Sequence, residues 1–137
     1  MAGWRFAASE ALSPVLDNFR RIQGQILRTV WRVDDEGSVD RVILGFGEMS
    51  FTVKAREDDD TVEFWTEETA AVIAGIDASK SQPWCGLIGK PFGWGWVAIN
   101  QQGYCDGILL SFGGIDPQVM LNVIASSTKE ITLGWPH

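Results

Sequence analysis

A strict alternation of apolar and polar side chains over residues 49–56 constrains the fold of this chain most strongly. An alternation with a period of two is typical of a β-strand that buries one face. Polar or glycine-containing stretches precede and follow this segment, as expected for tight turns between strands. The first half of the chain therefore predicts an antiparallel meander over residues 25–65, with strands at 25–33, 41–46, 49–56 and 61–65.

The second half repeats this pattern after an interruption. Residues 66–92 show no sustained alternation and predict a crossover made of short helical turns and loop. Ser13-Pro14 resembles a helix start, which predicts a helix over 14–23 ended by Gly24. We expect a single α+β domain over residues 1–137, mainly antiparallel β with about eight strands, whose second meander (94–135) has strands at 94–100, 104–112, 119–126 and 130–135.

Composition supports a folded domain. The chain has 137 residues, of which 45% are hydrophobic, enough for a real core. No apolar run approaches the roughly 20 residues that a membrane helix needs, and residues 1–19 lack the apolar stretch of a signal peptide. Cys85 and Cys105 are too few to suggest a disulfide framework. We therefore expect a cytoplasmic protein without a membrane partner.

Charge is unevenly distributed along the chain. Residues 34–77 contain 13 acidic and three basic residues, a local net charge of −10 within a total of −7, whereas residues 78–137 are neutral overall. Such a field repels nucleic acid phosphates and attracts a basic partner. Acidic hairpin tips that merely keep the protein soluble are the alternative interpretation.

The residue inventory argues against most catalytic chemistry. The single histidine, His137, is the last residue, and no phosphate-binding loop or dinucleotide fingerprint is present. Asp58-Asp59-Asp60 lacks the spacing of a calcium loop and reads more naturally as a solvated tip. Catalysis by two carboxylates, such as Asp106 with Glu63, stays open, although nothing in their spacing argues for it. We expect no metal, no cofactor and no enzymatic activity.

The most informative segment is an aromatic hairpin over residues 94–107. If the faces of its two strands coincide, Trp94 and Trp96 pack in the core, and Asn100 and Asp106 fix the turn. Alternatively, the rings stay exposed and form a contact patch, because Trp and Tyr are favoured anchors of interfaces. The candidate binding residues are Trp94, Trp96, Asn100, Tyr104 and Asp106, together with Asp58, Asp59, Asp60 and Trp65.

The same hairpin carries a resemblance. The run Trp94-x-Trp96-x3-Asn100-Gln101-Gln102-Gly103-Tyr104-x-Asp106, followed by Leu109-x-Ser111-Phe112, resembles a small uncharacterised bacterial domain family over residues 24–133. The acidic segment Asp58–Asp60 is similar to a hairpin of that family. The resemblance implies no activity. Size, acidity and architecture are also similar, in a generic way, to immunity proteins that neutralise toxins.

These observations lead to two functional hypotheses. In the first, the protein is a non-enzymatic interaction domain of the immunity or inhibitor type. Its acids at and after the third hairpin tip steer a basic partner, which Trp65 with Trp94 or Trp96 anchors. In the second, a pocket lined by Trp94, Trp96, Tyr104 and Asp106 binds a small ligand. Self-association through an exposed edge strand stays open.

Overall fold

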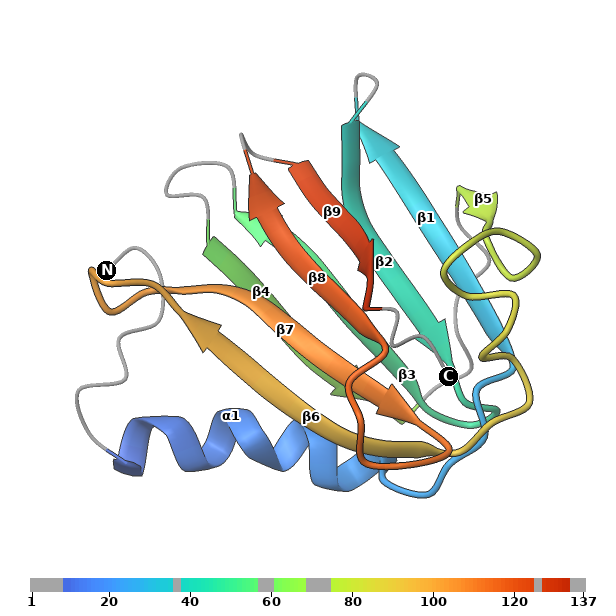
Figure 1. Cartoon of the computed structure of the whole chain (residues 1–137), viewed down its shortest axis with the longest axis horizontal. Coiled ribbons are helices and arrows are strands. Elements are labelled where there is room, and N and C mark those ends of the chain that lie inside the picture. The colour runs from blue at the N-terminus through green and yellow to red at the C-terminus, as the bar shows by residue number, and fades with distance from the viewer. Residues whose placement is uncertain (1–8, 36–37, 57–60, 69–74, 125–126, 134–137) are drawn as a thin grey trace.

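The computed structural model describes residues 9–35, 38–56, 61–68, 75–124 and 127–133. In these residues the chain forms one helix and nine strands, and the strands are arranged in two antiparallel sheets (Figure 1). The expectation of a mainly antiparallel α+β protein with a helix near its N-terminus is confirmed.

The first sheet contains the expected meander and one additional short strand. Its strands run in the order β4-β3-β2-β1-β5, so that β1 to β4 each pair with the next strand along the chain, as in successive hairpins. Gly47 turns the chain between β2 and β3 with a φ of +87°, a conformation that glycine adopts without strain. The bounds are β1 Thr29–Asp35, β2 Ser38–Gly45, β3 Ser50–Arg56, β4 Thr61–Glu67 and β5 Ile76–Asp77.

The first strand starts later than its alternation predicts. Residues 25–28 form no regular strand, and only an isolated bridge joins Ile26 to Pro91. Their backbone groups instead form hydrogen bonds with residues at and just before the start of β6. The Leu27 N–H donates to the Lys90 carbonyl at 3.0 Å, and the Phe92 N–H donates to the Gln25 carbonyl at 2.9 Å. The alternation at 25–28 therefore reflects burial of Leu27 between the two sheets.

The second sheet is the second meander, and its strands run in the order β6-β7-β8-β9. All its pairs are antiparallel. Its bounds are β6 Phe92–Ile99, β7 Cys105–Phe112, β8 Val119–Ile124 and β9 Ser127–Thr132.

The helix α1 spans Ser9–Ile22 and starts earlier than predicted. The interpretation of Ser13-Pro14 as the helix start was wrong, because the helix continues through Pro14. The predicted end is confirmed: Gly24 has a φ of +81°, and its N–H donates to the Phe92 carbonyl at 2.8 Å.

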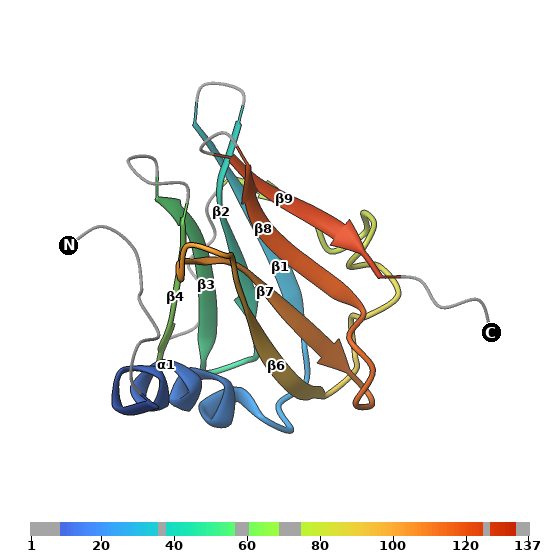
Figure 2. The same cartoon turned by 60° about the vertical axis from the view of Figure 1, so that its left-hand side comes forward.

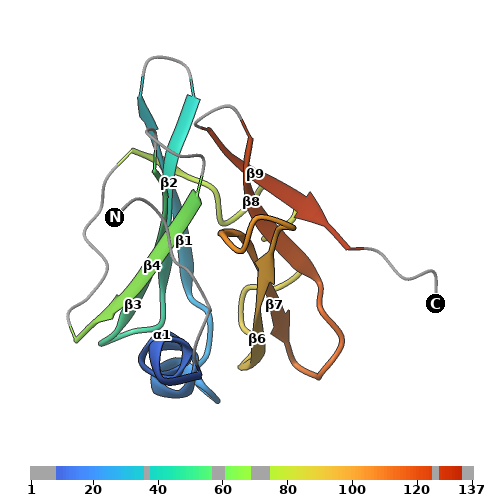
Figure 3. The ribbon, with the colours of Figure 1, turned by 90° about the vertical axis from the view of Figure 1, so that its left-hand side faces the viewer.

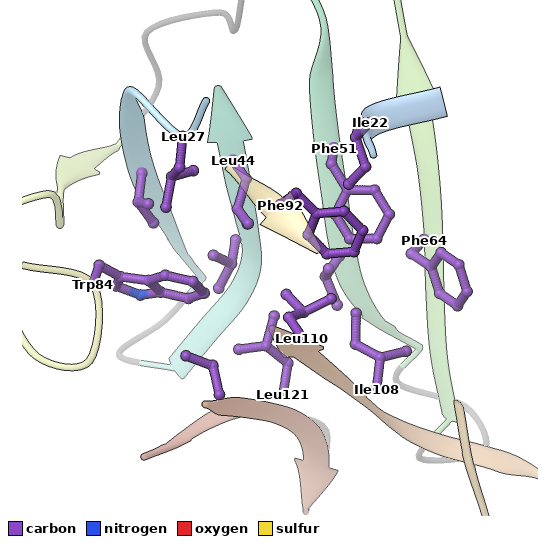
Figure 4. Close-up of a cluster of buried hydrophobic side chains, with 14 of the residues drawn as sticks. Ile22, Leu27, Leu44, Phe51, Phe64, Trp84, Phe92, Ile108, Leu110 and Leu121 are labelled. Atoms are coloured by element: carbon purple, nitrogen blue, oxygen red, sulfur yellow. The ribbon is translucent and has the colours of Figure 1, made fainter. Parts of the chain in front are cut away.

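The two sheets face each other and α1 closes one open end between them (Figures 2 and 3). Strands β2 and β9 contact each other, and α1 contacts β4 and β6. Both sheets and the helix contribute to one core (Figure 4). Phe19 of α1 stacks on Phe64 of β4 with ring centroids 5.0 Å apart, and lies 6.1 Å from Phe92 of β6.

The middle of the chain differs from the expected helical crossover. Residues 82–89 form successive hydrogen-bonded turns, in which Trp84 accepts bonds from Leu87 and Ile88, and they do not become a regular helix. Trp84 is completely buried and enters the core from the side of β1 (Figure 4). Burial of the Trp84 indole holds residues 82–89 in place, although these residues form no regular secondary structure.

Candidate functional site

Strand β6 presents both tryptophans of the aromatic hairpin to the solvent. Trp94 is 52% exposed and Trp96 is 37% exposed. Between them, Gly95 faces inward, because a Cβ there would collide with the ring of Phe19. The expectation that the two indoles pack in the core is therefore wrong, and the exposed arrangement, which the sequence left open, is the one observed.

Two irregularities explain why the sequence could not settle this point. The register of β6 against β7 shifts between Phe92 and Gly95 and again between Ala98 and Ile99. Each extra residue changes which face the following side chains occupy. Phe92 consequently points into the core while Trp94 and Trp96 point out of it.

The exposed tryptophans continue into an apolar row that crosses the whole second sheet. Trp96 pairs with Leu109, Leu109 with Met120, and Met120 with Ile131. Residues directly opposite each other in antiparallel strands share a face, so these side chains lie side by side on the outer surface. Leu109 and Met120 are half-buried and Ile131 is 38% exposed. We call Trp94, Trp96, Leu109, Met120 and Ile131 the apolar face.

Ser111 holds the backbone of Trp94 in place. Its Oγ accepts a bond from the Trp94 N–H at 2.8 Å and donates to the Gly114 carbonyl at 2.8 Å. Gly93 has no room for a side chain, since a Cβ would overlap the Gly114 carbonyl and the Ser111 hydroxyl. The serine of the sequence motif is thus a positioning residue for the exposed indole.

Asn100 fixes the turn between β6 and β7. Its Oδ1 accepts the N–H of Gln102 at 2.9 Å and that of Tyr104 at 3.2 Å, and Gly103 adopts the expected left-handed conformation with a φ of +87°. Tyr104 is half-buried immediately before β7. This confirms the interpretation of Asn100 as a turn-fixing residue.

Asp106 occupies the second β6–β7 irregularity. Cys105 pairs with Ile99 and Gly107 pairs with Ala98, so Asp106 is the additional residue of a bulge. Cys105 and Ile108 are buried on the inner side, which leaves Asp106 and Gly107 on the outer side. Its half-exposed carboxylate lies at the edge of the apolar face.

Trp65 belongs to a different surface. It pairs with Thr52 on the outer side of the first sheet, while its neighbour Phe64 is buried in the core. The Trp65 indole N–H donates to Glu67 at 2.9 Å. Because the outer sides of the two sheets face opposite directions (Figure 3), Trp65 cannot share a flat contact with Trp94 and Trp96. Asp58, Asp59 and Asp60 lie outside the described residues.

The expected aromatic pocket does not bring its four residues together. A hollow of about 110 Å³ lies between α1 and β6, lined by Trp94 with Leu16, Phe19 and Gly95 among others. Trp96, Tyr104 and Asp106 do not line it. Its volume is well below the roughly 300 Å³ at which small-molecule sites begin.

The two cysteines differ in exposure, since Cys85 is exposed and Cys105 is buried. Burial raises the pKa of the Cys105 thiol to about 12, so the thiol stays protonated at neutral pH and is a poor nucleophile. Within the described ranges, no three His, Cys, Asp or Glu side chains gather as a metal site would require. No helix among them is long and apolar enough to cross a membrane.

Sequence reasoning missed a charged cluster between the sheets. The Arg32 guanidinium of β1 forms a two-pronged ion pair with Glu130 of β9, one prong being Nε to Oε2 at 2.7 Å. The Trp84 indole N–H donates to the same carboxylate at 3.1 Å, and Arg32 also donates to the Gln82 carbonyl at 3.0 Å. The Glu130 side chain is only 8% exposed. No spacing in the sequence links residues 98 positions apart.

These features define a two-layer antiparallel β domain, closed by one helix, whose exposed surface on the second sheet is apolar. Residues 12–132 match the model of a family of unknown function, DUF6334, and the chain belongs to this family. The resemblance to a small uncharacterised domain is thereby confirmed. Neither the comparison with curated proteins nor that with solved structures gave a match.

Proposed function

We propose that the protein is a non-enzymatic interaction domain whose first layer binds a basic protein, as an inhibitor or immunity protein would. One observation carries this proposal. The segment with a net charge of −10, residues 34–77, supplies β2–β5 and the end of β1 in the first sheet, whereas the second sheet belongs to a segment without net charge. Charge that is divided between layers in this way orients an approaching basic partner toward one side.

The outer side of the first sheet offers aromatic anchors for such a partner. Trp31 pairs with Ile43, Ile43 with Thr52 and Thr52 with Trp65, so an indole lies at each end of a row across four strands. Both indoles are half-buried. Partly exposed tryptophans beside carboxylates provide contact area and a negative rim, as interfaces with basic proteins require.

The test separates steering from anchoring. The immobilised chain captures partners from a lysate of its source organism at low salt, and association and dissociation rates are then measured with each captured protein. Replacing Asp58, Asp59 and Asp60 together by Asn should slow association about tenfold at low salt with little effect on dissociation. Trp65→Ala should instead accelerate dissociation.

The matched control removes acidic charge from the neutral layer. Asp106→Asn with Asp116→Asn should leave the association rate within about twofold, because these carboxylates lie outside the acidic segment. Equal rates for the triple variant and the unmodified chain, or capture of no basic protein at low salt, would contradict the proposal.

A further inference from the structure

The outer side of the second sheet, which carries the apolar face, has no net charge. Among the described strand residues, its charged members are Lys129 on the edge strand β9 and Asp106 on the inner strand β7. The largest exposed apolar patch of a soluble monomer is often a site of interaction. The apolar face is therefore a candidate contact surface, and it is separate from the acidic layer on the first sheet.

We propose that a second copy of this chain covers the apolar face, so that two molecules pack with their β6–β9 sheets against each other. Charge distribution favours this arrangement. Two chains with a net charge of −7 each repel one another, and this repulsion is smallest when the contact involves residues 78–137, which have no net charge. Packing through the second sheets places the two acidic layers on the outside, as far apart as the molecules allow.

The row across the sheet is complementary to itself under a two-fold axis parallel to the strands. This axis places Trp96 of β6 over Ile131 of the partner subunit, and Leu109 of β7 over Met120 of the partner subunit. Large rings then meet smaller aliphatic side chains, as tight sheet packing requires. Lys129 of β9 comes opposite Ala98 of the partner subunit. Ala98 pairs with Gly107, which directly follows the bulge residue Asp106.

The contact uses the face of the sheet and not its edge. Both register shifts of β6 interrupt regular pairing along that edge strand. A face of four strands, with the six residues of β8 as its length, covers roughly 19 by 20 Å. Two such faces bury on the order of 800–1,000 Å² in total, which is below the roughly 1,200 Å² at which stable specific interfaces begin and is typical of weak, transient contacts. The dimer should therefore dissociate on dilution.

The first experiment is sedimentation velocity of the full chain over a concentration series. We expect a reversible monomer–dimer equilibrium, which Leu109→Lys weakens at least tenfold. The control Ile76→Lys introduces the same charge at a side chain that is 58% exposed on the first sheet, and should leave the equilibrium unchanged. Circular dichroism establishes that both variants are folded.

The second experiment tests the axis. In a Cys85→Ser background, a chain with Leu109→Cys and a chain with Met120→Cys are treated, separately and as a mixture, with a short bismaleimide that joins two thiols, because face-packed sheets lie about 10 Å apart and a direct disulfide does not span that distance. The proposed geometry predicts that the mixture forms the covalently linked dimer fastest. A monomer at all concentrations, a dimer that Leu109→Lys does not weaken, or linkage that is no faster in the mixture would overturn the proposal. Each outcome is independent of whether the acidic layer binds a basic protein.

Discussion

At the residue scale, the ion pair between Arg32 and Glu130 shows how a charged cluster stabilises the space between two sheets. Its carboxylate satisfies both the guanidinium and the Trp84 indole N–H. Glu130→Ala leaves these donors without their acceptor in a site that is largely shielded from water. Removing one partner of a buried pair is strongly destabilising, so we expect the free energy of unfolding to fall by about 2–3 kcal/mol in urea titrations.

Two further variants distinguish this effect from a general loss of charge. Arg41→Ala breaks the more exposed pair with Asp40 and should cost less than about 1 kcal/mol. Replacing Arg32 by Met and Glu130 by Leu together should recover part of the stability lost in Glu130→Ala, since no charge then stays unpaired. A Glu130→Ala chain as stable as the original would show that the pair contributes nothing.

The same scale shows which residues sequence reasoning could identify. Asn100 and Gly103 act within their own turn, so local chemistry is sufficient to predict them. Glu130 finds its partners on β1 and in the turns around Trp84. Such a contact exists only after both sheets have formed, and an isolated Glu in a strand pattern reads as solvent-exposed. Local roles are therefore predictable here, whereas contacts between layers are not.

At the element scale, the docking of α1 depends on Gly95. The ring of Phe19 lies directly against the backbone of β6, where any side chain would collide with it. Gly95→Ala should separate the helix from the strand and destabilise the protein by about 1–3 kcal/mol. Hydrogen exchange should accelerate first in α1. Gly86→Ala is the matched control, because a Cβ there has no neighbour within 4 Å. Equal protection of α1 in both variants would contradict this account.

The hydrophobic periodicity and the turn residues of the sequence predicted where the strands lie more readily than which face of each strand is buried. The alternation over residues 49–56 correctly predicted β3, with Phe51, Val53 and Ala55 buried. The same logic failed for β6, because two register shifts in its pairing with β7 invert the relation between spacing and face. Bulges leave little trace in composition. For this reason the sequence placed Trp94 and Trp96 correctly on a strand and left their exposure open.

At the scale of the whole molecule, the two layers divide the charge unequally, and this has a consequence for stability. Carboxylates concentrated in residues 34–77 repel one another in the folded protein. Salt screens this repulsion, with a Debye length of about 10 Å at 0.1 M and about 3 Å at 1 M. We therefore expect the free energy of unfolding to increase by about 1 kcal/mol between 0.02 and 0.5 M NaCl, measured in urea at a concentration where the chain is monomeric.

The chain with Asp58, Asp59 and Asp60 replaced by Asn tests whether this repulsion is the cause, because it removes three charges from the acidic segment and changes each side chain by one atom type only. Its salt-dependent gain should be smaller, and its stability at 0.02 M NaCl higher, than those of the unmodified chain. Asp106→Asn with Asp116→Asn should keep the full salt dependence. If the two variants respond to salt alike, repulsion within the first layer does not determine it, and preferential exclusion of salt from the whole surface accounts for any gain.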